Sequence, residues 1–141
     1  MSLLGLLQYV FAPLLPQVQI PQALSSSNDP NLVWSNEEYI NYVKSDKLSW
    51  GESIRFQTAS TIISIAQQAQ EESNLVSCPF LVFQDPLDAV TLMDGVTHLL
   101  SKSSTAESDK LLIEVIGGRH DVISNRLGFF IEHLIAWLEK Q

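Results

Sequence analysis

The sequence has few basic residues, one cysteine and no apolar run long enough to span a membrane. Its 141 residues include 8 Lys and Arg against 16 Asp and Glu, a formal net charge of −8. Tight nucleic-acid binding needs cations that neutralise phosphates, so nucleic acid is excluded as an expected partner. Cys78 cannot form an internal disulfide, and the sequence shows no Cys/His spacing typical of zinc. We therefore expect a cytoplasmic protein without a metal or cofactor.

What the sequence does have is apolar content, which reaches 45%. This is enough to offset the entropy of ordering a chain and excludes wholesale disorder. The first 15 residues are nearly all apolar, but they lack a basic segment of the signal-peptide type and are interrupted by Pro13 and Pro16. We expect a helix buried on most sides. A helix lying on a membrane surface is the alternative, with peripheral membrane contact.

Two capping boxes organise the rest of the first half. Ser35 with Glu38 predicts a short helix that ends near Val43, and Ser49 with Glu52 starts a longer amphipathic helix. The intervening segments are rich in polar and turn-forming residues, which is typical of internal loops. The first half is therefore predicted to be helical.

The second half alternates strands and helices. The expected elements are a strand over 80–83, a helix capped by Thr91 and Asp94, a strand over 111–116 and a helix over 126–139. Both strands are apolar on both faces, which favours a covered parallel sheet with a right-handed crossover. Two such strands do not make a stable sheet alone, so we expect an incomplete α/β fold. We divide it into a helical cap-like region over 1–76 and a parallel βαβα part over 77–141.

Asp88 and His120 are the candidate catalytic residues. Each lies in the loop after one of the two strands, and parallel strands end at the same edge of a sheet. A carboxylate that orients an imidazole allows it to act as a general base and then a general acid. His98 and His133 fall within predicted helices and are not expected to be ligands. Cys78 is expected to be a small buried residue.

The stretch SCPFLVFQDPLDAVTLMDG and the later stretch DKLLIEVIGGRHDVI together resemble the C-terminal part of monoacylglycerol lipase-like α/β-hydrolases, also grouped as serine aminopeptidase S33-type hydrolases. In that family the acid loop reads roughly H-G-x-x-D-x-V. The resemblance implies that Asp88 is the acid, Val90 the valine that follows it and His120 the base. It also implies hydrolysis of carboxylic esters of apolar or lipid alcohols by a Ser-Asp-His triad.

The chain departs from this family pattern in two ways. No G-x-S-x-G motif is present, so the nucleophile and the oxyanion hole that accompany it are missing from these residues. The chain is therefore expected to be a fragment of a larger hydrolase that is inactive alone. In addition, Gln84 and Asp85 replace His-Gly before the acid loop. Asp85 is expected to form a turn and to strain the loop or displace Asp88.

Two other interpretations remain open. One is a non-catalytic interaction module that self-associates or binds a partner through the open strand edge or the apolar N-terminal helix. The other is a parent related to epoxide hydrolases or dehalogenases, whose aspartate nucleophile would also lie outside this chain. A displaced nucleophile among Ser25 to Ser27 lacks the strained turn that would activate it.

Overall fold

The computed structural model describes residues 2–21, 29–48 and 53–140. The chain divides into two compact units, which we describe separately. The first unit comprises Met1–Asn28 and Trp50–Glu71, and the second comprises Asp29–Ser49 and Glu72–Gln141. These units do not follow the predicted boundary after residue 76. The assignment of the two regions to a cap and a hydrolase part stays a prediction.

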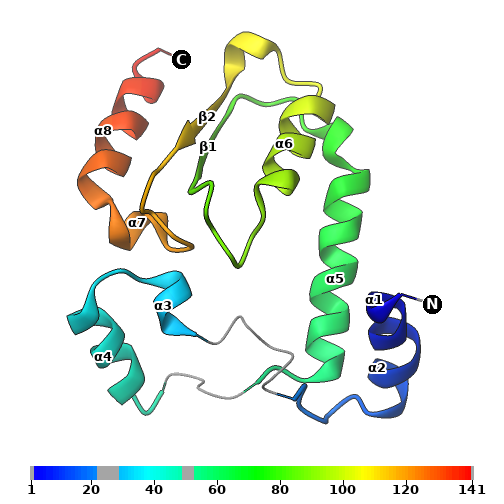
Figure 1. Ribbon diagram of the computed structural model, residues 1–141. Coiled ribbons are helices and arrows are strands. Elements are labelled where there is room, and N and C mark those ends of the chain that lie inside the picture. Colours follow the sequence, from blue (N-terminus) through cyan, green and yellow to red (C-terminus); the bar gives the residue numbers. More distant parts are fainter. Residues whose placement is uncertain (1, 22–28, 49–52, 141) are drawn as a thin grey trace. The chain divides into compact units, whose positions relative to one another are not determined.

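The first unit is helical. Its elements are α1 (Leu3–Leu6), the π-helical η1 (Leu7–Phe11), α2 (Ala12–Leu14) and α5 (Phe56–Glu71). The rings of Phe11 and Phe56 stack with their centroids 5.2 Å apart, and Gln19 forms an antiparallel bridge with Arg55. The Gln8 side-chain amide donates to Ser64 Oγ. These contacts hold the N-terminal helices against α5 (Figure 1).

The prediction that the N-terminal helix is buried on most sides is wrong. Leu3 is 71% exposed and Leu14 73% exposed, whereas Ala12 is buried. The helical segment also continues past Pro13, which lies in α2 directly after the π-helical η1. Across the described ranges, no helix combines the length and apolar character needed to cross a membrane.

The second unit contains the predicted parallel strands. Its elements are α3 (Pro30–Val33), α4 (Glu37–Ser45), the 3-10 turn η4 (Ser73–Leu75), β1 (Phe80–Gln84), α6 (Met93–Lys102), the 3-10 turn η5 (Glu107–Asp109), β2 (Lys110–Glu114), α7 (Val122–Asn125) and α8 (Leu127–Leu138). β1 and β2 pair in parallel, in a register that runs from Phe80 opposite Lys110 to Gln84 opposite Glu114. The predicted strand, helix, strand, helix order is confirmed.

Helices α6 and α8 both pack against β1, and Figure 1 shows them on either side of the two strands. The Phe83 ring on β1 lies 4.6 Å from the Phe130 ring on α8, centroid to centroid. Helices thus lie against both faces of β1, although its apolar residues are only half-buried. Within the described residues, the sheet has only these two strands.

Three local predictions are corrected by the structure. Asn36, not Ser35, caps α4: its side-chain oxygen accepts the N–H groups of residues 38 and 39. Leu92, not Thr91, is the residue before α6, because the Thr91 side chain is engaged elsewhere. Cys78 is exposed rather than buried. The second predicted capping box, Ser49 with Glu52, lies outside the described residues.

Candidate active site

Asp88 and His120 meet at the carboxyl end of the two parallel strands. His120 Nδ1 lies 3.0 Å from Asp88 Oδ2, within hydrogen-bond distance, although the residues are 32 positions apart in the chain. The Asp88 side chain is 3% exposed and that of His120 is 36% exposed. The carboxylate is therefore shielded while the ring reaches solvent. This is the convergence that the order of strands and loops predicts.

The Asp88 carboxylate accepts several hydrogen bonds besides that of His120. Oδ1 accepts the backbone N–H of Val90 at 2.7 Å and that of Thr91 at 3.1 Å. Oδ2 accepts the Thr91 hydroxyl at 2.6 Å and the Gln84 side-chain amide at 3.2 Å. Burial by itself would raise the pKa of Asp88, but the hydrogen bonds outweigh it, with the Thr91 hydroxyl first and His120 next, and lower the pKa to about 2.

Gln84 and Asp85, which replace the family's His-Gly, support the site rather than disrupt it. The Gln84 amide also donates to the Thr91 carbonyl at 2.9 Å, closing the loop around Asp88. Asp85 forms the predicted turn: its Oδ1 accepts the N–H of Leu87 at 2.9 Å. The predicted strain is wrong, because Asp85 is absent from the left-handed region of the backbone. Asp88 stays beside the base.

Asp85 also connects the two loops. Asp85 is only 2% exposed, and its Oδ2 accepts the backbone N–H of Arg119 at 2.7 Å. Arg119 is the residue before His120, and its φ of 49° is the only positive φ of a non-glycine residue in the described part of the chain. The buried Asp85 carboxylate thus binds the backbone of the residue that precedes the candidate base, His120.

The segment before α4 holds the other side of the base loop. The Arg119 guanidinium donates from Nη1 to the carbonyl of Trp34 at 2.9 Å and to that of Asn31. The Asn125 side-chain amide donates to the carbonyls of Val33 at 2.8 Å and Gly118 at 2.7 Å. The bonds to Asn31, Val33 and Trp34 join segments that lie 85 to 92 positions apart in the sequence. The loop that carries His120 is therefore bound on two sides.

A carboxylate next to His120 takes part in the same contact. Asp121 Oδ2 accepts the indole N–H of Trp34 at 2.8 Å, and its Oδ1 accepts the N–H of Ser124 at the start of α7. Burial alone would raise the pKa of Asp121, but the hydrogen bonds from Ser124 and Trp34 outweigh it and lower the pKa. Asp121 consequently stays ionised and anchors α7 to the segment before α4.

Gly118 permits the close path of this loop. A β-carbon at Gly118 would lie 2.9 Å from the backbone oxygen of Val115, closer than such atoms approach. Gly117 has a φ of 75°, and the Arg126 guanidinium occupies the space that its β-carbon would take. The two glycines in the loop after β2 are therefore needed for conformation and for space.

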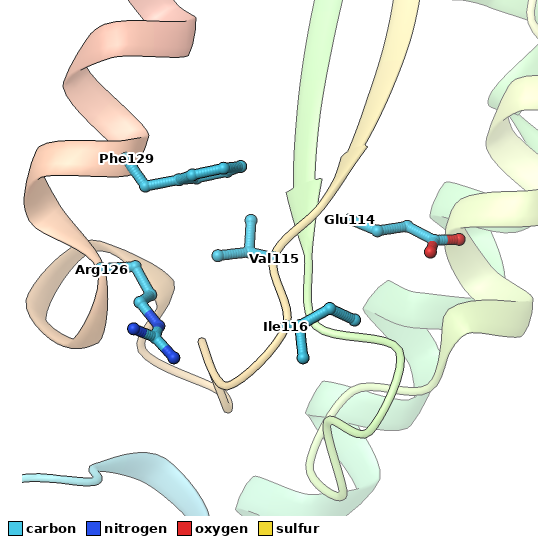
Figure 2. Close-up of a pocket in the computed structure, with 5 residues that line it drawn as sticks. All are labelled: Glu114, Val115, Ile116, Arg126 and Phe129. Atoms are coloured by element: carbon cyan, nitrogen blue, oxygen red, sulfur yellow. The ribbon is translucent and has the colours of Figure 1, made fainter.

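A cavity of about 220 Å³ lies beside the end of β2. It is lined by Glu114, Val115, Ile116, Arg126 and Phe129, as Figure 2 shows. The Phe129 ring points toward Val115, while the Glu114 carboxylate points away from the Arg126 guanidinium. Neither Asp88 nor His120 lines it. This cavity is thus distinct from the candidate active site.

The other sequence candidates do not join the site. His98 lies in α6 and His133 in α8, where the His133 ring stacks on Phe129. Ser25 to Ser27 lie outside the described residues. Where the structure describes the chain, no group of three His, Cys, Asp or Glu side chains could hold a metal ion.

Sequence reasoning missed three residues that contact the acid or the base loop. The sequence predicts a helix cap at Thr91, although the Asp-x-x-Thr spacing from Asp88 also fits a local side-chain hydrogen bond. The sequence predicts only a turn for Asp85 and only a departure from the family pattern for Gln84. The bond from Gln84 to Asp88 is local, four positions along the chain, whereas no local signal reveals the contact of Asp85 with Arg119, because it depends on how the two loops meet.

This geometry suits proton transfer. A neutral imidazole whose Nδ1 hydrogen is bound by an ionised carboxylate leaves Nε2 as the proton acceptor. The carboxylate also stabilises the imidazolium that forms. The described residues supply this pair, and the 141-residue sequence contains no G-x-S-x-G nucleophile motif.

Comparisons with known proteins agree with the geometry. A crystal structure of the monoacylglycerol lipase of Paleococcus ferrophilus matches with a TM-score of 0.77 at 20% sequence identity, over 98% of this chain and 52% of the lipase chain. The chain thus spans about half the length of that lipase. No curated protein matches. At this identity the likeness shows the fold, and it confirms an α/β-hydrolase architecture.

The family model of serine aminopeptidase S33 hydrolases matches residues 1–126. This range includes both halves of the sequence and the two loops that carry Asp88 and His120. It confirms the resemblance drawn from the strand and loop motifs. The chain belongs to the serine aminopeptidase S33 family of hydrolases, and its fold is that of monoacylglycerol lipase-like α/β-hydrolases.

Proposed function

We propose that this chain supplies the acid and the base of a serine hydrolase that cleaves carboxylic esters of lipids or similar apolar alcohols. Asp88 is the acid and His120 the base. The observation that carries the proposal is the 3.0 Å contact between His120 Nδ1 and Asp88 Oδ2 at the shared edge of two parallel strands. Membership in a family of serine hydrolases supports the proposed catalytic role of this pair.

The reaction proceeds in two halves. His120 Nε2 takes the proton of a serine hydroxyl as its oxygen bonds to the ester carbonyl carbon, and it then gives that proton to the departing alcohol oxygen. A water molecule next loses a proton to His120 and attacks the acyl-serine. The proton returns to serine as the carboxylic acid leaves. Asp88 stays ionised throughout and stabilises the imidazolium, in keeping with its lowered pKa.

The nucleophilic serine is proposed to come from residues other than these 141, because no glycine pair in the sequence frames a serine as G-x-S-x-G. In this arrangement, residues 1–76 act as a helical cap-like region and residues 77–141 as the C-terminal hydrolase part. Apolar substrates fit such a region because burying an acyl chain contributes about 0.8 kcal/mol per CH₂.

The first test is the coding sequence upstream of Met1. We expect a strand followed by G-x-S-x-G, and we expect the protein extended to include it to hydrolyse short-chain p-nitrophenyl esters. In that protein, H120A and D88N should lower kcat/KM by about a thousandfold or more, as removal of triad members does in other serine hydrolases.

The matched control is H133Q, since His133 lies on α8 away from the Asp88 contact. It should leave kcat/KM unchanged. The 141-residue chain alone should show no ester hydrolysis above background. If the 141-residue chain alone hydrolyses the ester and H120A abolishes that activity, the proposed location of the nucleophile outside these residues is wrong. If the upstream sequence lacks the G-x-S-x-G motif, the acyl-transfer proposal is wrong.

A second candidate function is a non-catalytic interaction module. Its supporting observation is apolar exposure in the first unit, where Leu3 and Tyr9 are 71% and 76% exposed. Such side chains favour association with a second copy or another apolar surface. Light scattering on the 141-residue chain tests this candidate: a discrete oligomer favours it, and a monomer that unfolds cooperatively contradicts it.

A further inference from the structure

We infer that Asp85 is a positioning residue for His120, replacing with a buried carboxylate the glycine that the family pattern has at this place. This inference rests on the proposed function, in which His120 is the base. Asp85 acts through the backbone of Arg119, whose N–H it accepts at 2.7 Å.

The geometry of Asp85 is that of a bridge with two separate ends. Oδ1 accepts the N–H of Leu87 in the acid loop, and Oδ2 accepts the N–H of Arg119 in the base loop. The Asp85 carbonyl also accepts the N–H of Asp88 at 3.0 Å. With the residue 2% exposed, water competes little for these bonds. One side chain thus fixes the distance between the two loops.

The backbone of Arg119 explains why a bridge is needed. Its φ of 49° is in the left-handed region, which is unfavourable for a residue with a β-carbon. A strong hydrogen bond from its N–H to a carboxylate offsets that cost. Because φ and ψ of Arg119 set the direction of the chain at His120, a relaxed Arg119 would turn the imidazole away from Asp88.

The other contacts of Arg119 do not hold its backbone N–H, which Asp85 accepts. The guanidinium binds the carbonyls of Asn31 and Trp34, so it anchors the far end of the side chain. That anchor fixes the position of the loop against the segment before α4. It does not hold the N–H of Arg119, for which Asp85 is the acceptor.

The test uses the 141-residue chain labelled with ¹⁵N, and D85A and D85N as variants. The readouts are the amide exchange rate of Arg119 and the low-field NMR signal of the His120 Nδ1 hydrogen bonded to Asp88. D85A removes both acceptors, so Arg119 exchange should speed up about tenfold or more, the factor expected for a lost bond to a buried charge. The His120 signal should be lost.

D85N keeps one neutral acceptor and should give an intermediate result, with exchange about threefold faster, because bonds to neutral acceptors are weaker. It also keeps the test informative if D85A fails to fold. D94N is the matched control, since Asp94 is exposed in the first turn of α6. D94N should leave both readouts unchanged.

The outcomes separate this inference from the proposed function. If the wild-type chain shows the His120 signal and folded D85A or D85N retains it with unchanged Arg119 exchange, the role of Asp85 is refuted and the Asp88 and His120 pair stands. If the wild-type chain lacks the signal, the pair itself fails and both are refuted. If D85A loses the His120 signal but still unfolds cooperatively, the result supports the inference.

Discussion

Acidification should weaken this protein through Asp88 in a way that can be calculated. Its pKa is lowered from 3.8 to about 2 in the folded chain by hydrogen bonds that outweigh the effect of burial. A carboxyl with a depressed folded pKa stabilises the fold above its unfolded pKa and loses that stabilisation as pH falls through its folded pKa. The window for Asp88 thus lies between about pH 4 and pH 2.

The expected loss follows from the two pKa values. The contribution to the free energy of unfolding should fall by about 1 kcal/mol by pH 3 and about 2 kcal/mol by pH 2, relative to neutral pH. Little of this is lost to solvent screening, since the Asp88 side chain is 3% exposed.

The assay is urea unfolding of the wild-type chain and of D88N at a series of pH values from 6 downward. Asn does not titrate, so D88N is less stable at neutral pH but should lose less stability on acidification, and the two curves should converge. The other lowered carboxyls, Asp29 and Asp121, titrate in both proteins and cancel in the difference. Parallel curves below pH 5 would refute the assignment of hydrogen bonds to Asp88.

Two further changes test the loops. T91V removes the hydroxyl that donates to Asp88 at 2.6 Å and should lower the free energy of unfolding by about 1 to 3 kcal/mol, whereas T91S should retain most of it, as urea titration would show. G118A places a β-carbon 2.9 Å from the backbone oxygen of Val115 and should lower the free energy of unfolding by about 1 to 3 kcal/mol. G95A, which has open space around it in α6, should raise the free energy of unfolding by about 0.5 to 1 kcal/mol. A G118A melting curve that overlays the wild type would contradict the packing argument.

Local signals in the sequence were sufficient for the strands and for the pairing of Asp88 with His120. An apolar run that begins after a proline predicts β1. The second strand, predicted over 111–116, runs over Lys110–Glu114 and so ends before the glycine pair at 117–118. Chain order then brings the two loops to one edge, because parallel strands share their direction. Helix caps were less predictable. Asn36 caps α4 in place of the predicted Ser35, because Ser35 binds Asn125 instead.

The exposure of side chains could not be judged from composition. The apolar character of Cys78 and Leu3 predicts that both are buried, yet both are exposed. Burial depends on what packs over a residue, which periodicity alone does not specify. The 45% apolar content shows that a core can form, but not which apolar residues form it.

The sequence by itself determined the parallel βαβα order, the family and the meeting of Asp88 with His120, because each follows from local patterns and chain direction. The tertiary structure alone decided what surrounds that pair. Asp85 reaches Arg119 across 34 positions, and Trp34 reaches Asp121 across 87. Contacts at such separations depend on loop paths and side-chain orientation in three dimensions, which no local sequence pattern encodes.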